Sequence, residues 1–368
     1  MASPRTIVRA DLALIGFGHV ARRFVSLLEE RRETLERTCD LHCRVVAIVT
    51  RRHGGIWNPD GVDTVKAHRV ATSDGCLTEL VHGGTSPVAD SFEAIDRLTG
   101  SDAWLRVVIE TTTLDIRAGQ PAIDHVVAAL ERGCHVVTAN KGPAAFAYDD
   151  LRRRADAAGV AFLFEGAVMD GVPLFNLVRE TLPAIRVLGF RGVVNSTTNH
   201  ILSALEDGDA FGPALARMQA DGIAEADASL DVDGWDAAAK AAAIANVLMD
   251  ARTTPHAVER TGIGPETAER AVAARRQGRR LRLVASAHRS NDAIVIAVRP
   301  LELPEDDLLA GLRGMANALV LQTDLLGETA ICQLEGGLTQ TAYALLSDLV
   351  TIRRRLRSPD EGQLRRSL

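Results

Sequence analysis

The sequence is poor in lysine. Its 368 residues include 42 lysines and arginines, but only Lys66, Lys141 and Lys240 are lysines. Arginine does not lose its proton in proteins, whereas a partly buried lysine changes its pKa readily. In a chain that otherwise uses arginine, we therefore expect lysine to be kept where a proton moves or where a substrate must be oriented.

Cysteines and long apolar runs are scarce as well. The five cysteines are scattered, odd in number and form no C-x-x-C pair, which argues against a disulfide framework or a zinc site and for a reducing cytoplasm. No apolar run approaches 20 residues, and no signal-like apolar segment precedes Gly16, which argues against a membrane protein. The net charge of −6 gives no reason to expect a nucleic-acid partner.

A glycine motif near the N-terminus predicts a dinucleotide site. Residues 10–15 have the pattern of a short buried strand, and the sequence G-x-G-x-x-A then leads into a helix-like segment. Gly16 permits the tight turn, Gly18 lets a pyrophosphate approach the backbone, and Ala21 keeps helix and strand close together. The predicted cofactor contacts in this turn are Gly16, Phe17, Gly18, His19 and Val20.

The next strand bears on the choice of cofactor. Residues 44–50 form a buried strand pattern that ends at Arg51 and Arg52, where an NAD-specific site has an acidic residue for the ribose 2′-hydroxyl. Two guanidinium groups suit a 2′-phosphate instead. We therefore expect NADP(H) to be favoured over NAD(H). The alternative, in an arginine-rich chain, is that both arginines decorate a surface loop.

Two further strands place polar residues at the same edge of the sheet. A strand at 106–109 is followed by Thr111 and Thr112, and a strand at 134–139 by Lys141. The carboxyl ends of parallel strands border the cofactor crevice, so these three residues are predicted cofactor contacts, although the threonines also suit an ordinary strand end. The β–α alternations predict an α/β fold with a Rossmann-type, doubly wound parallel sheet.

The pattern changes after about residue 160. Residues 280–303 alternate apolar and polar side chains about a turn at 290–292, which predicts an antiparallel hairpin. We therefore divide the chain into a dinucleotide-binding domain at 1–160, a second, α+β domain at 161–315 and a C-terminal segment at 316–368 that returns to the first domain.

Acidic side chains precede the last lysine. Glu225, Asp231 and Asp236 come before or within the start of an alanine-rich helix pattern at 235–249. Asp236 and Lys240 lie one turn apart on a single face of that helix. An isolated pair at this spacing is usually a surface ion pair, but the apolar neighbours leave little polar face here. The pattern indicates an acid–base or substrate-orienting role for Lys240, with carboxylates that receive a substrate's amino group.

Between Gly16 and Asp348 the chain resembles the homoserine dehydrogenase family. The shared motifs occur in the family's order and are GFGHVA, VTANKGP, EGAVMDGVP, GVVNSTTNHIL, GIAEADASLDVDGWDAAAK and GGLTQTAYALLSDL. The chain resembles the short form of the family, with neither an aspartokinase domain nor an ACT regulatory domain. Threonine feedback through such a domain is therefore not expected.

The resemblance implies an NAD(P)-dependent oxidoreductase that interconverts L-homoserine and L-aspartate 4-semialdehyde in threonine and methionine biosynthesis. Lys240 matches the family's catalytic lysine and Asp236 the carboxylate that assists it. Lys141 matches the lysine between nicotinamide and substrate, and it counts with them as catalytic. Glu225 matches a substrate-binding carboxylate, beside which Asp231, Asp236 and Lys141 are also expected to bind the substrate. Which lysine carries the proton stays open.

Further features are implied by the resemblance alone. A monovalent cation, Na⁺ or K⁺, is expected on Glu165, Val168, Asp170 and Val172, largely through backbone carbonyls. Gly337, in the closing glycine motif, is an expected cofactor contact. The second domain is expected to bind the substrate and to form a homodimer.

Three departures from the family pattern affect the substrate prediction. Met169 and Asp170 replace a Gly-Gly pair, Ser196 replaces a glycine, and the closing motif has Glu335 before its glycines. These positions lie near substrate and nicotinamide in the family. They leave open two alternatives: a paralogue that acts on a related hydroxy amino acid or amino-acid aldehyde, and a dinucleotide-binding regulator without activity.

Overall fold

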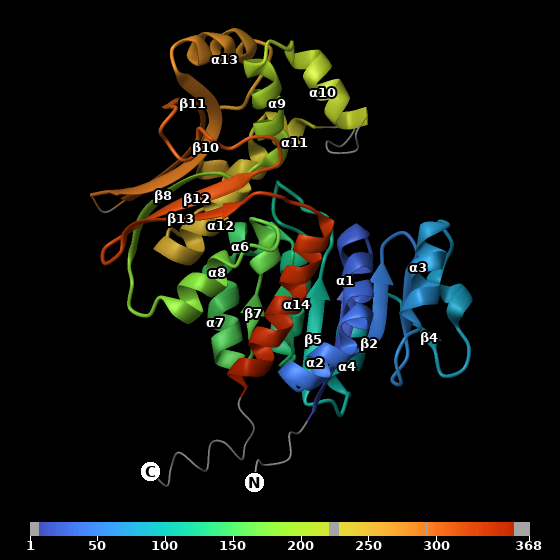
Figure 1. Cartoon of the computed structure of the whole chain (residues 1–368). Helices are drawn as coiled ribbons and strands as arrows, with labels where there is room; N and C mark the ends of the chain where they lie inside the picture. The colour runs from blue at the N-terminus through green and yellow to red at the C-terminus, as the bar shows by residue number, and fades with distance from the viewer. Residues whose placement is uncertain (1–6, 221–227, 292, 357–368) are drawn as a thin grey trace.

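Two sheets organise the chain (Figure 1). The protein is described from a computed structural model, and the described residues are 7–220, 228–291 and 293–356. Sheet A has the strand order β4-β3-β2-β1-β5-β6-β7. Its strands are β1 (Val8–Ile15), β2 (Leu41–Thr50), β3 (Gly54–Trp57), β4 (Ser86–Pro87), β5 (Leu105–Glu110), β6 (His135–Thr138) and β7 (Phe162–Leu163). The run from β2 through β1, β5 and β6 to β7 is parallel, so the predicted Rossmann-type sheet is confirmed.

One edge of sheet A was not predicted. β3 pairs antiparallel with β2, and β4 pairs with β3. Their segment is rich in glycine and polar residues, and strands of two to four residues are too short to show a period in sequence. The same region also contains the helix α4 (Ser91–Thr99).

Helices cover both faces of sheet A. Successive side chains of a strand point to opposite faces, so Leu12 and Leu14 of β1 pack in one core while Ala13 and Ile15 pack in the other. The first face carries α1 (His19–Glu30), α2 (Arg32–Cys39), α3 (Thr64–Thr72) and α14 (Leu338–Arg355). The second face carries α4, α5 (Ala122–Glu131), α6 (Lys141–Phe146) and α7 (Tyr148–Ala158). Burial on both faces explains why these strands read as continuous apolar runs.

Sheet B follows in the chain and has the order β13-β12-β8-β10-β11-β9. Its strands are β8 (Val187–Val193), β9 (Glu259–Arg260), β10 (Arg279–Ser290), β11 (Ala293–Pro304), β12 (Asn317–Thr323) and β13 (Gly327–Gln333). Its helices are α9 (Ser196–Glu206), α10 (Phe211–Ala220), α11 (Ser229–Val232), α12 (Trp235–Met249) and α13 (Thr267–Arg276). β10 and β11 pair antiparallel as predicted.

Short helical pieces complete the chain. They are α8 (Leu174–Asn176) and the turns η1 (Leu77–Leu80), η2 (Glu165–Ala167), η3 (Leu177–Thr181) and η4 (Pro255–Ala257). Within the described ranges, no helix combines the length and apolar character that a membrane crossing requires.

The C-terminal return begins later than the sequence suggests. β12 pairs with β8 and β13 with β12, so residues 317–333 complete sheet B. Of the described residues after 333, α14 alone lies against sheet A, where it packs beside α1 (Figure 1). Strand alternation shows that a segment is a strand but not which strand it pairs with, and for this reason the sequence places the return too early, at 316. The domain boundary at 160 stays a prediction.

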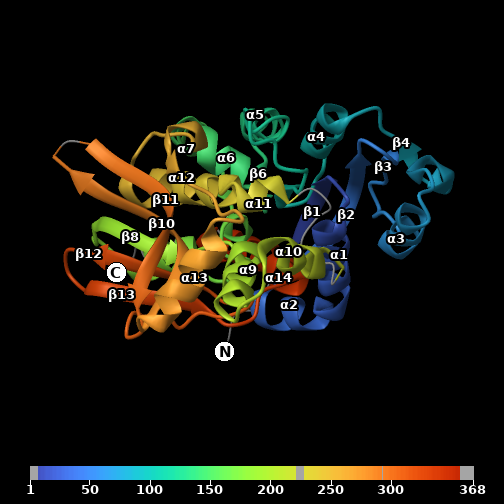
Figure 2. The same ribbon diagram turned by 90° about the horizontal axis from the view of Figure 1, so that it is seen from above.

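The alanine-rich helix α12 joins the two halves. In the view from above it lies between α6 and the strands of sheet B (Figure 2). Its alanines from Ala237 to Ala245 are buried, and such small side chains let α6 approach closely. The side-chain amide of Asn246 donates to the carbonyls of Ala144 and Ala145 at 3.1 and 3.2 Å. α12 is therefore fixed against the helix that begins at Lys141.

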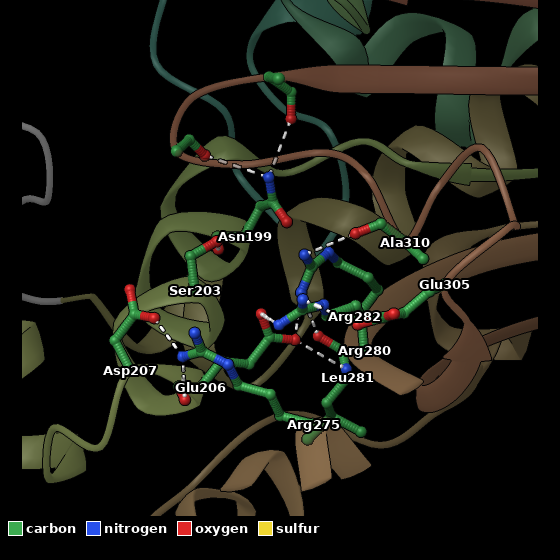
Figure 3. A network of polar contacts seen from close by, with 12 residues as sticks. Asn199, Ser203, Glu206, Asp207, Arg275, Arg280, Leu281, Arg282, Glu305 and Ala310 are labelled. Carbon is green, nitrogen blue, oxygen red and sulfur yellow. Dashed lines mark hydrogen bonds and ion pairs between the residues drawn. The ribbon is translucent and has the colours of Figure 1, made fainter. Parts of the chain in front are cut away.

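A buried ion pair fixes the C-terminal end of α9 (Figure 3). The Arg282 side chain is 0% exposed, and its Nη1 lies 2.8 Å from Glu206 Oε1. Arg282 also donates to the carbonyls of Leu281 and Ala310, each at 2.8 Å. Glu206 accepts a further hydrogen bond from the backbone N–H of Leu281. These contacts fix the C-terminal end of α9 on β10.

Candidate active site

A cavity of about 240 Å³ lies between the carboxyl edge of sheet A and α12. Its walls come from six places: the start of α1, the end of β5, the end of β6, the loop after β7, α12 and the start of α14. The lining residues are Val20, Thr111, Thr112, Ala139, Asn140, Lys141, Gly166, Ala167, Val168, Asp170, Lys240 and Thr341. Seven of them were predicted as site residues, so the structure brings residues from distant motifs together in one cavity.

Two lysines meet one carboxylate beside this cavity. Lys141 Nζ lies 3.0 Å from Asp236 Oδ1, and Lys240 Nζ lies 3.0 Å from Asp236 Oδ2. Lys240 Nζ also donates to the Val194 carbonyl at 2.6 Å. The side chains are 15 to 19% exposed. The spacing of Asp236 and Lys240 therefore produces a largely buried cluster, and the alternative of a surface ion pair is wrong.

Asn195 completes the cluster, and the sequence reasoning missed it. Its side-chain nitrogen donates to Asp231 Oδ1 at 2.7 Å and to Asp236 Oδ2 at 2.9 Å. Its side-chain oxygen accepts the Thr198 N–H at 2.8 Å and so caps α9. An asparagine before a helix predicts the cap alone, because the two carboxylates reach it only through tertiary folding.

The electrostatics of the cluster follow from these contacts. Burial alone would raise the pKa of Asp236, but the charges of Lys141 and Lys240, with the Asn195 hydrogen bond, hold it well below its usual range. Burial likewise lowers the pKa of Lys240, but the charges of Asp236 and Asp170 outweigh it, so the net shift is upward. Burial and the charge of Asp236 raise the pKa of Asp231.

The cofactor turn has the expected geometry. Gly16 has φ +92, and a Cβ there would lie 2.8 Å from the Thr111 backbone, so the turn requires glycine. A Cβ added at Gly18 would meet no atom of the described residues within 4 Å beyond its chain neighbours, and no side chain in those residues caps the start of α1. This leaves an open helix N-terminus of the kind that binds phosphate groups. Thr111 donates to the Gly16 carbonyl at 3.1 Å.

Other predicted cofactor residues lie around this turn but not in the cavity wall. Phe17 is 3% exposed, and its side chain packs in the core with α1. His19 begins α1. Arg51 and Arg52 are exposed in the turn that connects β2 with β3. Both arginines therefore lie at the carboxyl end of the second strand, where the 2′-phosphate prediction requires them.

The loop after β7 was predicted to hold a monovalent cation. Both carboxylate oxygens of Glu165 accept backbone N–H groups, from Phe175 at 2.8 Å and Asn176 at 2.6 Å. The Val172 carbonyl accepts the Leu174 N–H at 2.8 Å. Within the described ranges, no three His, Cys, Asp or Glu side chains gather as a metal site. A cation here would therefore depend on backbone carbonyls, including those of Val168 and Asp170.

Asp170 and Gly337 contact each other. Asp170 Oδ2 accepts the Gly337 N–H at 3.2 Å, directly before α14. The cavity wall formed by the β7 loop is thus tied to the closing glycine motif. Glu225, the remaining predicted substrate contact, lies outside the described residues.

Two family models match the sequence of this chain. The model of the family described as "Homoserine dehydrogenase, NAD binding domain" matches residues 16–165, and the model described as "Homoserine dehydrogenase" matches residues 173–350. Together the two models span the glycine turn, both site lysines and the start of α14.

Individual relatives cover almost the whole chain. An "NAD(+)-dependent homoserine dehydrogenase" of Pseudomonas canavaninivorans is 36% identical over 93% of this chain and 95% of its own length. A homoserine dehydrogenase of Methanocaldococcus jannaschii is 34% identical over 93% and 98%. A solved structure of a hyperthermophilic archaeal homoserine dehydrogenase in complex with NADPH superposes with a TM-score of 0.76 at 27% identity, covering 95% of this chain and 99% of that one.

Proposed function

Because the chain belongs to the homoserine dehydrogenase family and is an NAD(P)-dependent oxidoreductase that interconverts L-homoserine and L-aspartate 4-semialdehyde, we propose that Lys240 is its proton donor. Two of the three N–H groups of the Lys240 ammonium are directed to Asp236 and the Val194 carbonyl. The described residues leave the third for the substrate oxygen. The observation that best supports this proposal is the position of the Lys240 ammonium, which is held by two partners in the wall of a cavity that begins at the cofactor turn.

The protonation state of Lys240 suits the reduction of the aldehyde. Its raised pKa keeps it as an ammonium near neutral pH. When bound, the nicotinamide supplies the hydride. Negative charge then develops on the substrate oxygen, and a nearby ammonium stabilises that charge and gives up its proton. In homoserine oxidation the same group must accept the proton, so its raised pKa favours oxidation at alkaline pH.

The remaining members of the cluster have supporting roles in this proposal. Asp236 holds both ammonium groups at 3.0 Å and stays ionised. Asp231 has a raised pKa because it is buried beside Asp236. Its carboxylate would therefore be stabilised by the positive charge of the substrate's α-ammonium group. We assign the binding of that group to Asp231 together with Glu225. Lys141 begins α6 at the end of β6, between the cofactor turn and Asp236, where it can contact both cofactor and substrate.

For the cofactor we propose a preference for NADP(H). Arg51 and Arg52 follow β2 directly and are exposed, so both guanidinium groups are free to meet a 2′-phosphate. One relative above is named as NAD(+)-dependent, and the structural relative holds NADPH. The arginines at this position support the use of NADP(H). The test is the ratio of kcat/KM for NADP⁺ and NAD⁺, which should fall in the double variant Arg51→Ala, Arg52→Ala.

Three broader properties belong to the same proposal. A monovalent cation on the backbone carbonyls of the β7 loop is tested by the response of turnover to Na⁺ and K⁺ at constant ionic strength. A homodimer through sheet B is tested by light scattering. A reducing cytoplasm as the place of action fits the cysteines, which are all free thiols.

One experiment tests the proposed function as a whole. Reduced cofactor is followed at 340 nm with L-homoserine and a panel of other 3- and 4-hydroxy amino acids, each with NAD⁺ and NADP⁺. We expect L-homoserine with NADP⁺ to give the highest kcat/KM. A higher value for another amino acid would assign the chain to a different substrate, and a higher value with NAD⁺ would overturn the cofactor preference.

A further inference from the structure

Asp170 has an unusual backbone and an unusual set of partners. Its φ is +47, a left-handed conformation that a residue with a side chain adopts at a cost and that glycine adopts freely. Its carboxylate accepts three hydrogen bonds: at Oδ2 from Gly337 N and Gln333 Nε2, each at 3.2 Å, and at Oδ1 from Thr341 Oγ1 at 3.0 Å. The three donors lie on the last residue of β13, on the residue directly before α14 and in the first turn of α14.

This carboxylate lies where α14 begins. Gly337 is the N-cap residue of α14, and no side chain of its own segment caps that end. The partial positive charge of a helix N-terminus attracts a carboxylate, and Asp170, from a distant loop, accepts the N–H of the N-cap residue there. The fit is close, since a Cβ at Gly336 would lie 2.7 Å from Asp170 Oδ2, and a Cβ at Gly171 would lie 2.6 Å from the Gln340 carbonyl.

The same turn of α14 is also tied to the cofactor helix. Arg23 of α1 donates from Nε to Thr339 Oγ1 at 3.1 Å. α1 carries the open N-terminus expected to bind phosphate, while Asp170 and Thr341 line the cavity beside Lys240. The start of α14 therefore lies between the cofactor side and the substrate side of the site and contacts both.

We propose that Asp170 is a positioning residue that fastens the segment 335–337 and the first turn of α14 to the substrate loop. The contact holds the cofactor wall and the substrate wall of the cavity in one relative position. The proposal rests on the proposed function in one respect, the assignment of Gly337 as a cofactor contact. It explains why an aspartate occupies a backbone position that glycine would adopt more easily: the carboxylate is needed.

Two variants of Asp170 test this role. Asp170→Gly relaxes the backbone and removes all three contacts, and we expect the Kd for NADPH to rise about tenfold, the typical effect of losing a hydrogen bond to a charged group. Asp170→Asn keeps the shape but lacks the charge and one acceptor, and we expect a rise of roughly threefold. Fluorescence titration with NADPH measures both, and hydrogen exchange of residues 335–341 should become faster in the same order.

Asp40→Gly is the matched control. Asp40 also has a left-handed backbone, with φ +51, but it ends α2 and does not line the cavity. It should leave NADPH binding, turnover and exchange of residues 335–341 unchanged. Thr341→Val removes the hydrogen bond to Asp170 Oδ1 together with the one to the Gly337 carbonyl, and it should raise the Kd by about twofold.

The outcomes separate this proposal from the proposed function. Wild-type affinity for NADPH and unchanged exchange in Asp170→Asn and Asp170→Gly would overturn the positioning role, and Asp170→Asn decides alone if the glycine variant does not fold. An inactive wild-type enzyme with L-homoserine would overturn the proposed function, while the NADPH titration would still decide the role of Asp170.

Discussion

Two ion clusters lie at opposite ends of α9, and they differ in their cation. At the N-terminal end, Asn195 links Asp231 and Asp236 to two lysines beside the cavity. At the C-terminal end, Glu206 pairs with Arg282, which is 0% exposed and lines no part of that cavity (Figure 3). The cluster with the two lysines borders the cavity, and the cluster with Arg282 is buried inside the protein.

The difference follows from the chemistry of the two cations. The Arg282 guanidinium bonds one carboxylate and two backbone carbonyls, and its planar fork keeps a fixed charge in place. The Lys240 ammonium is compact, carries three donors and can lose a proton. In a chain with only three lysines, two lie in the cavity where we propose that Lys240 transfers a proton. The comparison predicts that damage to the first cluster reduces turnover, and that damage to the second reduces stability.

The largest expected effect is on turnover. Lys240→Met removes the proposed proton donor, and Lys240→Arg keeps a positive charge but cannot give up a proton. Both variants should lower kcat by about 10²- to 10⁴-fold, the usual range for loss of a general acid, while NADPH binding survives. Steady-state rates at 340 nm measure the loss.

Lys66→Met is the control for these variants. Lys66 is exposed and pairs with Asp63, the N-cap residue of α3, at 2.9 Å, so its replacement should keep full activity. Full activity in Lys240→Arg would show that charge alone is needed, and it would remove the distinction between the two clusters.

The second effect is on stability. Glu206→Gln leaves the buried charge of Arg282 without its partner, and breaking a buried pair in this way typically costs about 3–5 kcal/mol. The free energy of unfolding from urea titrations should fall by that amount, while kcat of the folded enzyme changes little. Asp209→Asn, in the exposed pair with Arg217, should cost less than about 1 kcal/mol. Equal losses in both variants would contradict the structural role of the buried pair.

The sequence was sufficient for the part of the site that local pattern encodes. The tight turn at Gly16, the strand ends before Thr111 and Lys141, and the one-turn spacing of Asp236 and Lys240 each depend on neighbouring residues. Parallel strands then bring their carboxyl ends to one edge. The resemblance to the family, not these local patterns, implied a joint role for the two lysines, and α12 brings them together by packing on α6.

The contacts that depend on distant pairing were not predictable. Asn195 reads as a helix cap, and its second use appears only when α11 and α12 fold against it. Asp170 stood out in sequence as a departure from the family, but the sequence did not show that its carboxylate reaches Gly337, 167 residues away. Ser196, another departure, bonds the Met315 carbonyl at 3.1 Å. Such contacts require the three-dimensional arrangement.

The smallest expected effect is a gain in stability when Asp231 is replaced, whereas Glu206→Gln loses stability. The folded-state pKa of Asp231 is raised by burial and by Asp236, so its ionised form opposes folding at pH values above the unfolded value of about 3.9. Asp231→Asn keeps an oxygen to accept from Asn195 and removes the repulsion. At neutral pH the free energy of unfolding should therefore rise, by less than about 1 kcal/mol, and the gain should vanish as the pH falls and wild-type Asp231 becomes protonated.

The same substitution should weaken substrate binding. If Asp231 receives the α-ammonium of homoserine, Asp231→Asn should raise the KM for homoserine while the Kd for NADPH stays constant. Thermal unfolding between pH 4 and 8 measures the stability, steady-state rates measure the KM, and fluorescence titration measures the Kd for NADPH. A variant that is less stable at neutral pH would show that Asp231 is held by favourable contacts in the free enzyme. In that case the Asp231 charge would not need a substrate ammonium to stabilise it. The cluster at the N-terminal end of α9 would then be stabilised by its own contacts, like the cluster around Arg282.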